Sequence, residues 1–202
     1  CAPVYGQTTP GPLAPFANSI FVEKQHSTGS YIQNQIDLTE RWKALVGVRY
    51  DDFEQEITNG VTNAVTAPTA TATSPRFGLV FDASEKMSVY ASFSKGFRPN
   101  GGVNFAGQAF APEFSKSYEI GTKLSTEDKR ISATVALYKA EKSNILATDP
   151  VNAGFSIAAG EAESQGVEID VTGQLTDNTN VYFSYAHTDA EITKSALDPN
   201  FG

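Results

Sequence analysis

Apolar and polar side chains alternate residue by residue along several long segments of this chain, and this alternation restricts its fold more than any other feature. Val89, Ala91 and Phe93 share one side of a stretch in which Ser88 and Ser92 share the other. A period of two residues is the geometry of a β-strand, whose successive side chains point to opposite faces. The chain is therefore predicted to be all-β, with one apolar and one polar face on its sheet.

The pattern predicts eight long antiparallel strands. They span residues 28–38, 41–56, 74–83, 86–97, 114–125, 129–147, 155–175 and 178–192. Several are longer than the five or six residues common in globular proteins, and long enough to cross a bilayer, which takes about 9–11 tilted residues. Gly160 and Gly166 interrupt the seventh strand, where we expect a bulge or a bend.

The connections between these strands alternate in length. Short polar turns are expected at Leu38–Arg41, Asp82–Lys86, Ser125–Lys129 and Leu175–Asn178, and longer loops at 57–73, 98–113 and 148–154. Short turns at one end and long loops at the other are typical of outer-membrane barrels, whose extracellular loops are the long ones. The sequence therefore predicts transmembrane strands whose apolar face meets lipid.

Composition argues against several other classes of protein. The net charge of −8 and the lack of a basic stripe argue against a nucleic-acid partner. No apolar run reaches the length of about 18 residues that a transmembrane helix needs. The single cysteine, Cys1, precludes an intrachain disulfide, and is either simply the first residue of the sequence or a lipidated one.

Catalytic and metal-binding chemistry also lack a recognisable pattern. No group of Cys, His and carboxylate residues has the spacing of a metal site. His187 and Asp189 share one face of the last predicted strand, but the sequence places no Ser or Cys nucleophile beside them. We therefore expect no catalytic residues, no metal site, no cofactor and no enzymatic activity.

Short phrases along the chain resemble, in the same order, the barrel of TonB-dependent siderophore receptors. They include Gly47-Val-Arg-Tyr-Asp, Ser74-Pro-Arg-Phe-Gly, Ser88-Val-Tyr-Ala-Ser-Phe-Ser-Lys-Gly-Phe-Arg-Pro, Ser117-Tyr-Glu-Ile-Gly-Thr-Lys and Gly166-Val-Glu-Ile-Asp. The resemblance covers about residues 28–192 and is closest to the ferric-hydroxamate, ferrichrome-type subgroup. It implies a barrel of about 22 strands in the outer membrane of a Gram-negative bacterium, filled by an N-terminal plug domain.

The resemblance also implies a role in iron uptake. Such receptors bind a ferric siderophore on the extracellular side and import it with energy from the TonB complex, which they contact through their N-terminal region. Residues 1–202 have room for about eight such strands and show neither a plug nor a TonB-contacting segment, so we expect an internal section of the barrel domain. The expected partners are a ferric siderophore, the TonB complex through a region outside this sequence, and outer-membrane lipid.

Candidate ligand-binding residues are sought on the side of the long loops. The siderophore already saturates its iron, so the protein has to recognise only an organic shell, a task that suits aromatic side chains and a few polar groups. Five candidates fit this description: Tyr5, Phe97, Arg98, Phe105 and Phe110. Arg98 would pair with an anionic or carbonyl-rich ligand. Alternatively, these side chains pack a large loop against its neighbours.

Two other functions remain open on the sequence alone. An outer-membrane barrel enzyme, such as a protease or lipase, would need a nucleophile or an acid–base set on the loop side. A small autonomous barrel with a structural or adhesive role is compatible with the strand count, because eight strands can close. Hydrolytic activity would identify the first, and closure of the sheet on itself the second.

Overall fold

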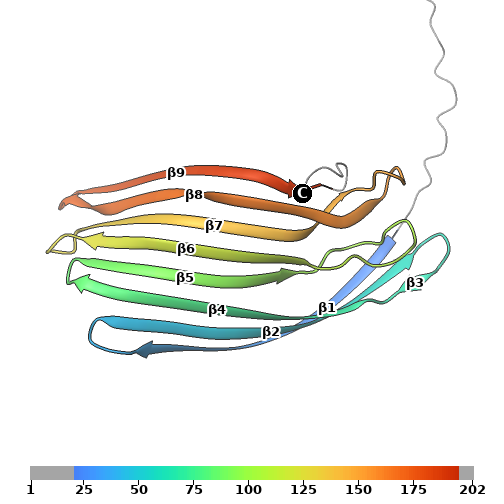
Figure 1. Cartoon of the computed structure of the whole chain (residues 1–202), viewed down its shortest axis with the longest axis horizontal. Coiled ribbons are helices and arrows are strands. Elements are labelled where there is room, and N and C mark those ends of the chain that lie inside the picture. Colours follow the sequence, from blue (N-terminus) through green and yellow to red (C-terminus); the bar gives the residue numbers. More distant parts are fainter. Residues whose placement is uncertain (1–20, 196–202) are drawn as a thin grey trace, which may run out of the picture.

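The computed structural model describes residues 21–195, which form an antiparallel β-sheet (Figure 1). Its strands are β1 (Phe21–Asp37), β2 (Trp42–Asn59), β3 (Val65–Thr66), β4 (Thr69–Ser84), β5 (Met87–Arg98), β6 (Glu113–Ser125), β7 (Ile131–Thr148), β8 (Ser156–Thr176) and β9 (Thr179–Lys194). The long strands follow one another across the sheet in sequence order, and the two-residue β3 pairs with β2. The prediction of eight long antiparallel strands is confirmed. No helix in the described part of the chain is long and apolar enough to cross a membrane.

Short turns join the strands at one end of the sheet and longer segments join them at the other (Figure 1). The turns are 38–41, 85–86, 126–130 and 177–178, and the longer segments are 60–68, 99–112 and 149–155. This confirms the predicted segregation of loops. Within residues 21–195, β1 and β9 are the two edges of the sheet and do not pair with each other. The described part is therefore an open section of barrel wall and not a small closed barrel.

The strand register places the apolar side chains of neighbouring strands on one face, which we call the outer face. Ile169 of β8 lies directly opposite Val135 of β7 and Tyr185 of β9. Ile120 of β6 likewise lies opposite Leu137 of β7. Residues directly opposite each other in an antiparallel pair share a face, so the apolar surface is continuous from strand to strand. Ile120 and Leu137 are 54% and 56% exposed, which a water-soluble sheet of this size would not tolerate over so large a patch.

Aromatic rings occupy two levels of the outer face. Near the short turns, the rings of Trp42 and Phe81 lie 4.7 Å apart between centroids. Further toward the loops, Phe93 lies 5.1 Å from Tyr118, and Tyr50 of β2 is half exposed. Aromatic residues at both ends of an apolar band are the arrangement that outer-membrane barrels use at the two membrane interfaces.

The predicted loop at 57–73 is wrong in part, because the two strands beside it continue further than expected. β2 reaches Asn59 and β4 begins at Thr69, with β3 pairing back onto β2 between them. The run Thr69-Ala-Thr-Ala-Thr alternates β-branched and small residues, and such a run suits a strand although its composition resembles a loop. The turn itself is confined to 60–64, where the Asn59 side chain accepts the backbone N–H groups of Val61 and Thr62 at 2.9 and 3.1 Å. β1 also begins earlier than predicted, at Phe21, because it pairs with this extension of β2.

The bulge expected in the seventh long strand is present at one of the two glycines. The register between β7 and β8 shifts beside Ile145, which faces Gly160. At Gly166 the register is regular, and the glycine has a different role. A Cβ at Gly166 would overlap the backbone carbonyl oxygen of His187 and lie 2.9 Å from the Tyr138 hydroxyl. Gly166 is therefore required by the close approach of its two neighbouring strands.

Candidate ligand-binding site at the mouth of the barrel wall

The inner face of the sheet, opposite the apolar one, carries polar and charged side chains that bind one another. Lys43 of β2 pairs with Asp82 of β4 at 2.7 Å, and the Tyr90 hydroxyl of β5 donates to Glu119 of β6 at 2.6 Å. Within β2, Arg49 pairs with Asp51 at 2.7 Å. Such contacts need water or polar partners around them, since isolated charges are costly in hydrocarbon. The inner face is therefore the wall of a polar interior.

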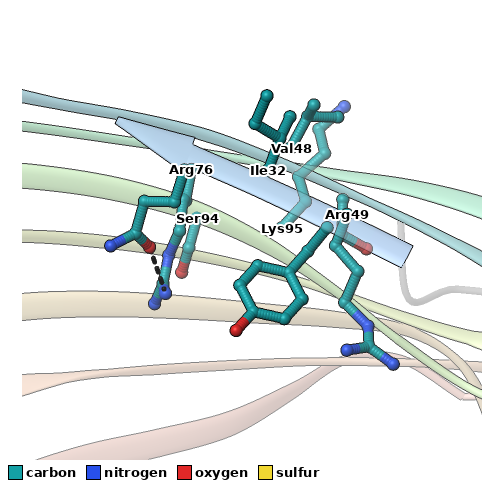
Figure 2. A pocket seen from close by; sticks show the side chains of 9 residues that line it. Ile32, Val48, Arg49, Arg76, Ser94 and Lys95 are labelled. Carbon is teal, nitrogen blue, oxygen red and sulfur yellow. Dashed lines mark hydrogen bonds between the residues drawn. The ribbon is translucent and has the colours of Figure 1, made fainter. Parts of the chain in front are cut away.

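A cavity of about 570 Å³ lies against the inner face where β1, β2, β4 and β5 meet. Figure 2 shows Arg49 and Arg76 extending to one side of the ribbon, and Ile32 and Val48 to the other. Arg76 Nη1 donates to the side-chain oxygen of Gln33 at 3.2 Å. Arg49 already pairs with Asp51, so an oxygen-rich anionic group in this cavity would be met by Arg76, whose planar donors match carboxylate-like geometry. No residue pattern along the chain points to this cavity.

The structure separates two of the predicted ligand-binding residues, Phe97 and Arg98, which end β5. Phe97 continues the outer-face row of β5 and packs against Phe114 of β6, with ring centroids 5.9 Å apart. Arg98 follows on the inner face, opposite Glu113. Because the two side chains point to opposite faces, they cannot contact one ligand in the barrel interior together. Arg98 is the one that faces it.

The two other predicted residues that the structure describes lie in the segment 99–112, which we call the mouth loop. Phe105 is 61% exposed and meets Phe155 edge to face, with ring centroids 5.2 Å apart and planes at 88°. The half-buried Phe110 ring lies 3.5 Å from where a Cβ on Gly102 would be, so it lies against the start of the loop. Tyr5 lies outside the described residues. The structure thus places Arg98 at the base of the mouth loop and Phe105 within the loop, both at one end of the wall.

The mouth loop crosses the sheet instead of standing away from it. The Thr66 hydroxyl, on the hairpin beyond β2, donates to the Gly107 carbonyl at 3.4 Å. At its start, a Cβ on Gly101 would lie 3.1 Å from the Glu23 carboxylate of β1. Nearby on the inner face of β2, Phe53 and Ile57 are only 5% and 2% exposed. The loop therefore reaches from β5 past β4 and β2 to β3 and β1.

Phe155 is a candidate that the sequence analysis missed. It lies in the segment 149–155 between β7 and β8, at the same end of the sheet as the mouth loop. Its ring is the direct partner of the Phe105 ring. The pattern predicted Phe155 as the first residue of the strand 155–175, so a search among loop aromatics does not select it, whereas in the structure β8 begins one residue later, at Ser156.

Asp149 holds the segment that carries Phe155. Its Oδ1 accepts the backbone N–H groups of Val151 and Asn152 at 2.8 and 3.0 Å, and its Oδ2 accepts the Asn152 side-chain amide at 2.9 Å. The Asn152 amide first, and then the two backbone donors, lower the pKa of Asp149 below its ordinary value of 3.8. The charged carboxylate is thus the form that keeps this segment folded.

We expect the 149–155 segment to loosen in acid. A group whose pKa is lowered by folding contributes stability above its unfolded pKa, near 3.8 here, and this contribution is lost as the pH falls through the lowered value. A nitroxide at the exposed position Val151 should therefore be ordered at neutral pH and become mobile below 3.8, as measured by its electron paramagnetic resonance line shape. In an Asp149→Asn variant the line shape should not depend on pH. An acid transition that persists in Asp149→Asn would contradict this assignment.

The described residues include both members of the His–Asp pair that the sequence placed on one face of the last strand. No group of three or more His, Cys, Asp and Glu side chains in residues 21–195 is arranged to hold a metal ion. His187 lies opposite Val167 and Asp189 opposite Gln165, both on the outer face of the edge strand β9. This position is on the other side of the sheet from the polar interior and from Arg98.

Comparison with known proteins places the chain among barrel-forming receptors. Residues 2–201 match the family model described as TonB dependent receptor-like, beta-barrel. The chain is 38% identical over 202 residues to the metal-pseudopaline receptor CntO of Pseudomonas aeruginosa, covering 95% of this chain and 28% of that receptor. It is 37% identical over 175 residues to the ferrichrome outer membrane transporter/phage receptor of Escherichia coli, covering 85% of this chain and 23% of that one.

A solved structure shows the same architecture. The siderophore receptor PiuA from Acinetobacter baumannii superposes with a TM-score of 0.77 at 28% sequence identity, over 86% of this chain and 26% of that receptor. The chain thus spans about a quarter of the length of the relatives that it matches. These relatives are receptors and transporters by their names, and none is named as an enzyme. The chain belongs to the TonB-dependent receptor β-barrel family, as a section of the wall of an outer-membrane barrel.

Proposed function

We propose that the receptor containing this chain imports a ferric siderophore across the outer membrane, with energy delivered by the TonB complex. The observation that carries the proposal is the match of the chain from residue 2 to residue 201 to the barrel of this receptor family. Relatives across the range of identity are named for siderophores or related metal chelates: ferrichrome, ferrioxamine B and metal-pseudopaline. The segregated faces of the sheet fit the same role, since one face suits lipid and the other a polar interior.

In this proposal the chain supplies wall and mouth, and the rest of the receptor supplies the remaining functions. The outer face contacts outer-membrane lipid. The plug domain and the region that contacts the TonB complex belong to parts of the receptor outside residues 1–202. The siderophore is recognised at the mouth by Arg98, Phe105 and Phe110, joined by Phe155, because these lie on the inner face or in the segments at the loop end. Tyr5 remains a candidate from the sequence, whereas Phe97 is left out because it faces outward.

The chemistry required of these residues is non-covalent. A siderophore that already saturates its iron leaves no coordination site for a protein ligand, so recognition acts on the organic shell. Exposed aromatic faces such as that of Phe105 bury apolar parts of a ligand, and Arg98 pairs with its anionic or carbonyl oxygens. No bond needs to form or break, and we propose that the receptor is not an enzyme.

Uptake of radio-iron by cells that express the intact receptor tests this function. With iron-loaded ferrichrome and ferrioxamine B as probes, uptake of at least one should occur and should stop when the TonB complex is deleted. Uptake that continues without the TonB complex would contradict energy-coupled import.

The same assay tests the role of Arg98. Loss of a hydrogen bond to a charged group costs about 1.5–3 kcal/mol, so Arg98→Ala should raise the half-saturating concentration roughly tenfold or more. Arg130→Ala is the matched control, because Arg130 lies in the turn 126–130 at the opposite end of the sheet and pairs there with Asp177 at 3.1 Å. Equal effects of the two substitutions would argue against a ligand contact by Arg98.

A further inference from the structure

We propose that Asn100 and Asn144 are positioning residues of the ligand site, because together they fix the path of the mouth loop. This inference rests on the import function proposed above and adds to it the residues that shape the site. Asn100 is the second residue of the mouth loop, two residues after Arg98, and Asn144 lies in β7. We call the pair the amide clasp.

The amide clasp joins three pieces of chain in a closed circuit. The Asn100 side-chain amide donates to the Ala111 carbonyl and to the Asn144 carbonyl, both at 2.8 Å. The Asn144 side-chain amide donates to the Pro112 carbonyl, also at 2.8 Å. The start of the loop is therefore bonded to its end, its end to β7, and β7 back to its start. All three bonds use side-chain amides as donors and backbone carbonyls as acceptors, so a change in either asparagine leaves carbonyl groups without these donors.

The backbone of β7 is shaped to present Asn144. Its φ is 59°, in the left-handed region that few residues other than glycine adopt and that asparagine tolerates. The register between β7 and β8 shifts on both sides of Ile145, the next residue. A bulge of this kind turns a side chain away from the regular alternation of the strand. Here it directs the Asn144 amide to the end of the mouth loop.

The rest of the mouth loop has weaker restraints. Its middle contacts β3 through the 3.4 Å bond from Thr66 to Gly107, and Phe105 meets Phe155 through ring contact alone. Gly102 and Gly107 have φ values of 89° and 75°, which any ordered path of the loop must keep. The amide clasp is thus the strongest bonded anchor described for this loop. Because Arg98 precedes it and Phe105 follows it, the clasp sets the position of one relative to the other.

The consequence is that the mouth loop keeps one position relative to the wall and does not open and close around the ligand. A loop that swung away from the wall to admit a ligand would need to break the two hydrogen bonds that join its ends to β7 in each cycle. A fixed loop instead presents its ligand-binding groups in place before the cargo arrives, which lowers the entropic cost of binding. The amide clasp therefore acts on affinity through the position of other residues and without touching the ligand.

Substitutions at the amide clasp in the full-length receptor test this role with two readouts. Backbone hydrogen exchange over residues 101–110 reports on the loop, and equilibrium binding of iron-loaded ferrichrome and ferrioxamine B reports on the site. Asn100→Ala should accelerate hydrogen exchange in the loop by about 5- to 30-fold. It should also weaken the affinity for whichever of the two chelates binds by about 5- to 30-fold, since it removes two hydrogen bonds of modest net value. Asn144→Gly keeps the backbone conformation but loses the donor, so it should have a similar effect. Asn180→Ala, at the short-turn end of β9, is the matched control and should change neither readout.

An isosteric variant separates positioning from a loss of packing. Asn100→Asp has the same shape, but its carboxylate faces the Ala111 and Asn144 carbonyls without a donor, so exchange and binding should be impaired at neutral pH. Protonation on lowering the pH, within the range above 3.8 where the 149–155 segment stays folded, restores one O–H donor, so both readouts should recover in part and together, which Asn100→Ala cannot do. Unchanged exchange in Asn100→Ala and Asn144→Gly would overturn the amide clasp, and accelerated exchange with unchanged affinity would overturn its positioning role alone. Failure of the wild-type receptor to bind either chelate would overturn the import function, and the positioning role with it.

Discussion

Replacing Ile169 with lysine is expected to prevent most of the receptor from reaching its folded, inserted state. Ile169 lies in the middle of the outer-face run Val167, Ile169 and Val171 of β8, between Val135 and Tyr185 on the neighbouring strands. A lysine on the lipid face of a barrel costs about 2–4 kcal/mol at the bilayer midplane. No lysine-binding partner is near, because the side chains directly opposite on both strands are a valine and a tyrosine.

A substitution on the other face of the same strand is the control. Thr172→Lys places the same charge on the inner face, close to Asp170, which lies two residues away on that face. The folded fraction of the full-length receptor can be measured by heat-modifiable migration and by its yield in the outer membrane. Ile169→Lys should reduce both strongly and Thr172→Lys should leave both near wild type. Equal tolerance of the two substitutions would mean that the outer face does not meet hydrocarbon.

Replacing Gly166 with valine is expected to destabilise the wall between β7 and β9 by about 3 kcal/mol. A Cβ at this position meets the backbone carbonyl oxygen of His187 on one side and the Tyr138 hydroxyl and ring, at 2.9 and 3.0 Å, on the other. The tyrosine can rotate away, but the backbone of β9 cannot move without disturbing its pairing with β8 along the whole strand. A side chain at position 166 therefore disturbs the pairing of β8 with β9 along the whole strand.

A substitution at the neighbouring position on the same face shows whether β8 is destabilised by any large side chain or only by one at Gly166. Ser164→Val, two residues earlier on β8, adds a β-branched side chain to a strand that suits one. Midpoints of unfolding by denaturant in detergent should fall clearly for Gly166→Val and little for Ser164→Val. A Gly166→Val receptor as stable as wild type would show that β8 and β9 do not approach each other as closely as described here.

The faces of the sheet could be predicted from the sequence because each residue's face depends on local alternation alone. Val89, Ala91 and Phe93 are on the outer face as expected, and the short turns are at one end as expected. The extension of β2 and β4 into 57–73 could not be predicted in this way. The β4 extension, residues 69–73, pairs with residues 50–54 of β2, and its threonine and alanine content also suits a loop, so this part of the strand forms only because a partner is present.

Prediction of the candidate site was less complete, for two different reasons. Phe97 shares the parity of Phe93 on β5, so alternation alone places it on the outer face, although it lies next to a long loop. Asn144 was not predictable, because its role depends on a bulge and on the return of the mouth loop to β7. Contacts of this kind arise from the folded wall and leave no periodic signal in the chain.

The most direct test of the account is a scan of solvent and lipid accessibility along β8 in the full-length receptor. Nitroxides would be placed one at a time at the six successive positions from Val167 to Thr172, and their collision rates measured with oxygen, which concentrates in lipid, and with a water-soluble nickel complex. Collisions with oxygen should dominate at Val167, Ile169 and Val171, which lie on the outer face. Collisions with the nickel complex should dominate at Glu168, Asp170 and Thr172, which lie on the inner face. Collision rates that do not alternate, or that show the three apolar positions shielded from both reagents in a packed core, would contradict a wall with lipid on one side and water on the other.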